Sequence, residues 1–110
     1  MAISLRVLIV EDSPDDAELL ARELRRGGYE LEFERVDTRP AMEEALARHA
    51  WDLVASDHSM LQFDCNAAME VLKSSGADIP FIIVSGTIGE ERAVEAMKAG
   101  ASDYLIKGNL

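Results

Sequence analysis

The stretch that decides the fold runs from residue 7 to residue 16 and reads VLIVEDSPDD. Its first part is a continuous apolar run, which is typical of a strand buried on both faces of a parallel sheet. Ser13, Pro14 and Asp16 then supply a capping hydroxyl, a proline for the first helical position and a capping-box acid. The stretch therefore predicts a strand followed directly by a helix, with two acids in the turn between them.

The alternation of strand and helix continues along the rest of the 110 residues. Leu31 and Phe33 alternate with glutamates, as in an exposed edge strand. Three further apolar runs predict strands at residues 53–56, 81–84 and 104–106. With the first run, these segments predict five strands.

Helical patterns separate the predicted strands. The first helix is expected to end at the glycine pair of residues 27–28, because glycine favours the end of a helix. A second helix is expected after Thr38, with Met42, Ala45, Leu46 and His49 as its inward face. Two more helices are expected at residues 66–74 and 90–99.

This order of elements predicts the fold class. Strands that alternate with helices favour right-handed crossovers and a parallel sheet covered on both faces. We predict an α/β, flavodoxin-like, doubly wound five-stranded sheet of order 2-1-3-4-5, with ligands bound at the carboxyl ends of the strands. The sequence stops directly after the fifth strand, so we expect a single domain over residues 1–110 from which the usual fifth helix is absent. The sequence alone does not choose between further chain and a partner as the cover for that side of the sheet.

Composition narrows the class of partner. Asp and Glu number 21 against 11 Lys and Arg, a formal net charge of −10, which argues against nucleic acid as a direct ligand. Cys65 is the single cysteine, so no intrachain disulfide can form and a reducing compartment is expected. The N-terminus lacks a signal-peptide pattern, and the apolar runs are too short to cross a membrane. We expect a cytoplasmic protein without membrane contact.

Four of the predicted strands are followed by, or end in, polar side chains. These are Glu11 and Asp12 after the first, Asp57 after the third, Ser85 after the fourth and Lys107 after the fifth. Because parallel strands end at the same edge of the sheet, the side chains are expected to converge. Three clustered carboxylates repel one another, and Mg²⁺ is the cation that suits such oxygen ligands. An aspartate beside Mg²⁺ and a lysine predicts phosphoryl transfer to that aspartate.

These segments carry a family resemblance. They are VLIVED at residues 7–12, SD at residues 56–57, IVSG at residues 83–86 and GASDYLIK at residues 100–107. Together they resemble the response-regulator receiver domains of two-component phosphorelays. The resemblance implies a domain that accepts a phosphoryl group from a histidine kinase or phosphotransfer protein. It also implies a conformational switch read by a downstream protein, with homodimerisation as one form of output.

The resemblance implies a metal site and a phosphoacceptor. Asp57 would accept the phosphoryl group. Mg²⁺ would be held by the side chains of Asp12 and Asp57, by the main-chain carbonyl of Ser59, and by Glu11 through water. Lys107 would pair with the phosphoryl group. No separate enzymatic activity is expected beyond the domain's own phosphorylation and dephosphorylation.

The resemblance also implies switch and timing residues. Ser85 would bond the phosphoryl group and move toward it. Tyr104 would then turn inward as the aromatic switch. Ser59 and Thr87, each two residues beyond a site residue, would tune the lifetime of the acyl phosphate. Departures from the family pattern fall at Leu61, Gln62 and Gly108, where the family often has other residues, including a proline after the lysine.

Three other functions are compatible with parts of the pattern. A flavin carrier of this fold needs a phosphate-binding loop after the first strand, but the loop here is rich in acids. A haloacid-dehalogenase-like phosphohydrolase would carry a second acid two residues after the nucleophile, where this chain has Ser59. A degenerate receiver would bind a partner without phosphorylation, which the altered loop at Leu61 and Gln62 keeps open.

Overall fold

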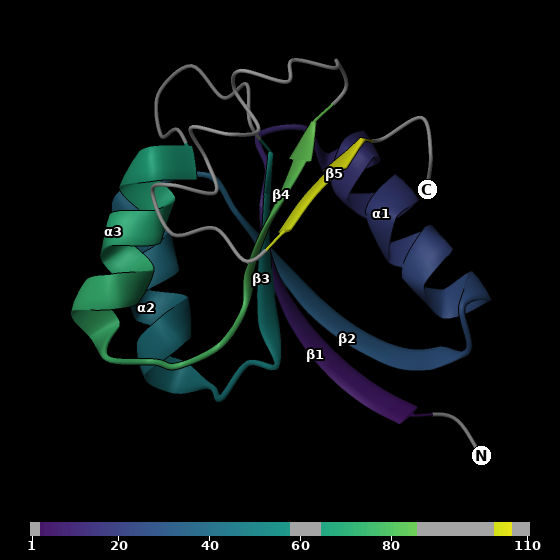
Figure 1. The fold of residues 1–110 in the computed structure, drawn as a ribbon, viewed down its shortest axis with the longest axis horizontal. Coiled ribbons are helices and arrows are strands. Elements are labelled where there is room, and N and C mark those ends of the chain that lie inside the picture. Colours follow the sequence, from purple (N-terminus) through teal and green to yellow (C-terminus); the bar gives the residue numbers. More distant parts are fainter. Residues whose placement is uncertain (1–2, 58–64, 86–102, 107–110) are drawn as a thin grey trace.

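The computed structural model describes residues 3–57, 65–85 and 103–106. The described part is a five-stranded sheet of order β2-β1-β3-β4-β5 whose neighbouring strands all pair in parallel, as predicted. Helix α1 lies on one face of the sheet, and α2 and α3 lie on the other (Figure 1). The elements are β1 Ile3–Val10, α1 Pro14–Arg26, β2 Tyr29–Val36, α2 Arg39–Arg48, β3 Leu53–Asp57, α3 Cys65–Ser75, β4 Phe81–Ser85 and β5 Asp103–Ile106.

Strand β1 is buried on both faces over its second half, as its apolar run predicted. Val7, Leu8 and Val10 have no exposed surface, and Ile9 is 2% exposed. Leu8 and Val10 belong to the apolar cluster that includes residues of α2 and α3, whereas Val7 and Ile9 belong to the cluster that includes residues of α1. The alternation of side chains along a strand thus places β1 at the centre of a three-layer core.

Helix α1 begins and ends where the sequence predicted. The Ser13 hydroxyl accepts a hydrogen bond from the Asp16 main-chain N–H at 3.3 Å, and Pro14 opens the helix. The Gly27 N–H donates to carbonyls of the last turn, and Gly28 follows with a φ of +96°, which an L side chain rarely adopts. These signals fix where the chain leaves β1 and where it enters β2.

Helix α2 confirms part of its predicted inward face. The Thr38 hydroxyl caps it by accepting from the Ala41 N–H at 3.3 Å, and Met42 and Ala45 are fully buried. The prediction that His49 lies on the buried stripe was wrong. The helix ends at Arg48, so His49 takes an extended conformation, leaves the helical period and is exposed.

The strands differ from the sequence expectation mainly at their ends. Strand β1 begins at Ile3 instead of residue 7, because its main chain pairs with β2 along its whole length whatever the polarity of the side chains. Strands β3 and β4 each extend by one residue, to Asp57 and Ser85. The expected helix at residues 90–99 and the region beyond residue 106 lie outside the described residues. Within the described part, no helix has both the length and the apolar character needed to span a membrane.

Candidate functional site

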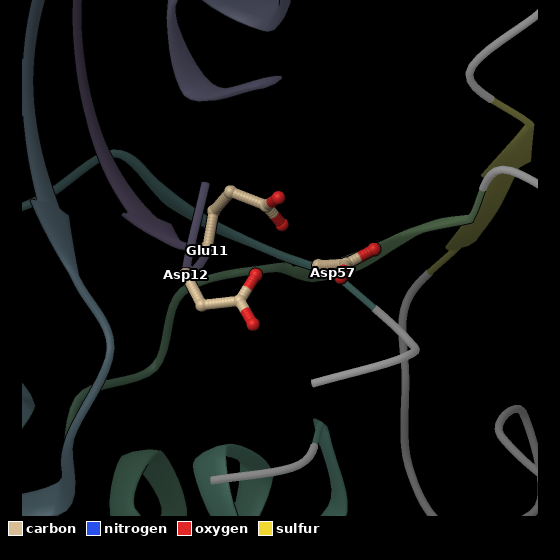
Figure 2. Close-up of side chains that lie close together, drawn as sticks. All are labelled: Glu11, Asp12 and Asp57. Atoms are coloured by element: carbon tan, nitrogen blue, oxygen red, sulfur yellow. The ribbon is translucent and has the colours of Figure 1, made fainter. Parts of the chain in front are cut away.

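Three acids meet at the carboxyl edge of the sheet. Glu11 and Asp12 follow β1, and Asp57 ends β3. One carboxylate oxygen from each lies within 4.8 Å of the others. Figure 2 shows the side chains of Glu11 and Asp12 extending from the end of β1 toward the side on which Asp57 lies. The structure therefore brings together these predicted site residues.

The register of two strands explains this meeting. Val10 of β1 pairs with Ser56 of β3, so the residues that follow them leave the sheet side by side. Strand β1 has β2 on its other side, so the site lies where the order of the sheet changes direction. This is the position at which open parallel sheets bind their ligands.

The three acids differ in exposure. Glu11 is buried at 4% exposure, Asp57 is half-buried and Asp12 is exposed. Like charges so close together repel one another, and a bound cation relieves that repulsion. An all-oxygen set of carboxylates suits a hard cation such as Mg²⁺. Within the described part of the chain, this cluster contains no imidazole or thiolate of the kind that zinc favours.

The turn that carries two of these acids is bonded to its neighbours at both ends. The Glu11 N–H donates to the Val36 carbonyl of β2 at 2.9 Å. Arg35 of β2 donates from Nη1 to the Glu11 carbonyl oxygen at 3.1 Å. At the other end, the Ser13 carbonyl accepts from the Ala17 N–H at 3.1 Å, which begins α1. Hydrogen bonds of Glu11 and Ser13 thus hold the turn on both sides of Asp12.

Arg35 is the residue at the site that sequence reasoning missed. It lies opposite Ile9 in the register of β1 and β2. An arginine in an edge strand carries no signal of its own in the sequence. The signal becomes visible only when the two strand ends are aligned, because the last residues of β2 then lie beside Glu11.

A pocket adjoins the acids on the α1 side of the sheet. Its apolar wall includes Leu19 and Leu20 of α1 and Val84 of β4, and its polar end is formed by Glu11 and Asp57 among others. Leu19 is 44% exposed, which is high for a large apolar side chain. Glu11 and Asp57 therefore line one end of a largely apolar hollow.

The structure places two other predicted residues by their main chains. Asp57 pairs with Val84, and the next residue, Ser85, pairs with Ile106 at the end of β5. Tyr104 lies within β5 and pairs with Ile83. The remaining predicted or atypical positions lie outside the described residues, namely Ser59, Leu61, Gln62, Thr87, Lys107 and Gly108.

Comparison with known proteins matches the chain to a family model and to named relatives. The family model for the response regulator receiver domain matches residues 7–109. The response regulator protein FleR of Pseudomonas aeruginosa is 36% identical over 105 residues, which cover 96% of this chain and 22% of that protein. The chain therefore spans about a fifth of the length of this curated relative.

Solved structures give the same result. The receiver domain of a signal transduction histidine kinase from Syntrophus aciditrophicus is 32% identical, with a TM-score of 0.71, and the match covers 94% of this chain and 78% of that one. A response regulator from Hahella chejuensis is 29% identical, with a TM-score of 0.75, and the match covers 96% of this chain and 81% of that one. These matches favour the receiver over the flavin carrier and the phosphohydrolase.

Proposed function

The chain belongs to the response regulator receiver domain family, and we propose that Asp57 is the residue through which it accepts a phosphoryl group. Mg²⁺ would be held by the side chains of Asp12 and Asp57 and by the Ser59 carbonyl, with Glu11 acting through water. The observation that carries this proposal is the cluster of three carboxylates, whose oxygens lie within 4.8 Å of one another.

The position of Asp57 in the sheet supports its choice over the other two acids. Strand β3 lies between β1 and β4. Asp57 therefore has the acids that follow β1 on one side and the end of β4, at Ser85, on the other. A phosphoryl group on Asp57 would lie between the acids that follow β1 and the end of β4, whereas one on Asp12 would lie farther from β4 and β5 in the sheet order.

The chemistry follows from the charges. A carboxylate oxygen of Asp57 attacks phosphorus, the bond from phosphorus to the donor breaks, and the donor leaves with that electron pair. The acyl phosphate increases the negative charge beside two acids, and a cation held by these acids would supply the positive charge that offsets it. Glu11 is only 4% exposed, which supports the proposal that it would contact the cation through a water molecule while Asp12 would bind the cation directly.

The remaining roles rest on the family and on strand order. Ser85 hydrogen-bonds a phosphoryl oxygen and Lys107 pairs with its charge. Movement of Ser85 lets Tyr104 turn inward, which changes the surface that partners contact. Ser59 and Thr87 tune how fast water hydrolyses the acyl phosphate. The chain catalyses only its own phosphorylation and dephosphorylation.

The partners follow from the same chemistry. The phosphoryl group comes from a histidine kinase or phosphotransfer protein in the cytoplasm, and a downstream protein or a second copy of the chain reads the switched surface. Residues 1–110 act as one receiver unit, and nucleic acid is not a direct ligand of this unit. The charge of −10 supports the last point, because phosphate backbones require basic surfaces.

Incubation with acetyl phosphate and Mg²⁺, followed by intact mass spectrometry, tests the proposal. Wild-type chain should gain a single phosphoryl group, and EDTA should prevent the gain. Asp57→Asn should gain none. Asp78→Asn is the matched control, because Asp78 is exposed and lies in the α3–β4 connection, at the opposite edge of the sheet.

The result separates this proposal from the degenerate receiver. A wild-type chain that gains no phosphoryl group would support the degenerate receiver. A gain that survives Asp57→Asn would move the acceptor to another residue. A gain that Asp78→Asn also abolishes would point to loss of the fold instead of loss of the acceptor.

A further inference from the structure

Arg35 contacts the turn that carries the metal-binding acids through the main chain. Its Nη1 lies 3.1 Å from the Glu11 carbonyl oxygen and 3.5 Å from Asp37 Oδ2. The side chain is 33% exposed, so it lies against the protein at the end of β2. The guanidinium thus contacts both Asp37, which follows β2, and the turn that follows β1.

The carbonyl that Arg35 contacts belongs to the peptide unit joining Glu11 to Asp12. A peptide unit is planar, so holding its oxygen restricts the direction in which both flanking side chains leave the chain. The Glu11 N–H is also bonded to β2, at 2.9 Å from the Val36 carbonyl. Both main-chain polar groups of Glu11 are therefore bonded to the end of β2.

We propose that Arg35 is a positioning residue of the metal site, which holds the Glu11–Asp12 peptide so that the two carboxylates face the cation. This inference rests on the proposed function, because it concerns the same Mg²⁺ site. Groups that orient metal ligands commonly change metal affinity by about 10- to 100-fold when they are removed. Arg35 acts on the main chain from a partly exposed position, so the lower end of that range applies.

The charge of Arg35 has the opposite effect on a cation. A guanidinium near the site repels Mg²⁺, so its removal should tighten Mg²⁺ binding if charge alone mattered. Asp37 offsets part of that charge at 3.5 Å. Positioning and charge therefore predict opposite signs, and a binding measurement distinguishes them.

Calorimetric titration of the whole chain with Mg²⁺ shows whether replacement of Arg35 weakens or tightens Mg²⁺ binding. Arg35→Met should weaken Mg²⁺ binding about tenfold. Arg35→Gln retains a donor without the charge, and it should remain within about threefold of wild type if positioning dominates. Arg48→Met is the matched control, because Arg48 of α2 pairs with Glu34 of β2 at 2.8 Å and, among the described residues, has no hydrogen bond to the turn after β1. It should leave the affinity unchanged.

Thermal unfolding in EDTA separates positioning from general stability. Arg35→Met and Arg48→Met should lower the melting temperature to a similar small extent, while only the first changes Mg²⁺ affinity. Equal or tighter Mg²⁺ binding by Arg35→Met would overturn the inference and leave the proposed function intact. A wild-type chain that binds no Mg²⁺ would overturn both. If Arg35→Met fails to fold, Arg35→Gln supplies the sign, and tighter Mg²⁺ binding by Arg35→Gln than by wild type would overturn the inference.

Discussion

The amino edge of the sheet and the acid cluster at its carboxyl edge place charged residues differently. At the amino edge, charges of opposite sign pair and serve the main chain. Arg6 Nη2 lies 3.1 Å from Glu32 Oε2. The main-chain N–H of Arg6 donates to Asp52 Oδ2 at 2.7 Å, and the main-chain N–H of Asp52 donates to the Arg6 carbonyl oxygen at 2.8 Å. At the carboxyl edge, three acids gather with oxygens within 4.8 Å of one another.

This difference separates charges that stabilise the fold from charges that prepare a site. Paired charges contribute to the folded state without a ligand, although exposed pairs contribute little. Clustered like charges cost stability until a ligand compensates them. Charge removal should therefore destabilise the chain at the amino edge and stabilise it at the carboxyl edge when no metal is present.

The largest expected effect is on metal binding at the carboxyl edge. Asp12→Asn removes a charged ligand of the metal. Mg²⁺ affinity should fall at least about 100-fold, which is the upper range for losing a group that only hydrogen-bonds a metal ligand. Calorimetric titration measures it. Asp52→Asn, at the amino edge, is the control and should bind Mg²⁺ as wild type does. Equal losses from both changes would remove the distinction between the edges.

The next effect is on stability at the amino edge. Asp52→Ala leaves the Arg6 N–H without its carboxylate, and unfolding free energy should fall by about 1 kcal/mol because the site is exposed. Urea denaturation measures this loss. Asp78→Ala, a change at an exposed loop position, should stay within about 0.5 kcal/mol of wild type. A smaller loss from Asp52→Ala than from Asp78→Ala would contradict the structural role.

The smallest effect is a gain in stability at the carboxyl edge. Asp12→Asn in EDTA should raise the unfolding free energy by about 0.5 kcal/mol, because one of three like charges is removed. Saturating Mg²⁺ should reverse the order, since wild type then gains binding energy that the variant lacks. Urea denaturation with and without Mg²⁺ tests the reversal. A variant less stable than wild type in EDTA would show that the cluster is not strained by repulsion.

The sequence predicted most of the fold because its strongest signals are local. Burial of Val7 and Ile9 on one face and Leu8 on the other follows from an unbroken apolar run. The bounds of α1 follow from Ser13 and the glycine pair that ends it. These features depend on a few neighbouring residues, which a sequence displays directly.

The sequence predictions failed where contacts between residues far apart in the sequence determine the structure. The early start of β1 depends on pairing between Ile3 and Tyr29, which side-chain polarity does not reveal. The exposed His49 follows from the end of α2 one residue earlier. The meeting of Glu11, Asp12 and Asp57 was predictable because parallel strands share an edge. The contact of Arg35 was not, because it needs the register of β1 and β2.

Identification of the phosphorylated residue tests the central claim most directly. Chain treated with acetyl phosphate and Mg²⁺ is reduced with borohydride, which converts an aspartyl phosphate to homoserine, and its peptides are sequenced by mass spectrometry. The account predicts homoserine at position 57, with Asp12 unchanged. Homoserine at position 12, or at neither position in chain that has gained a phosphoryl group, would contradict it.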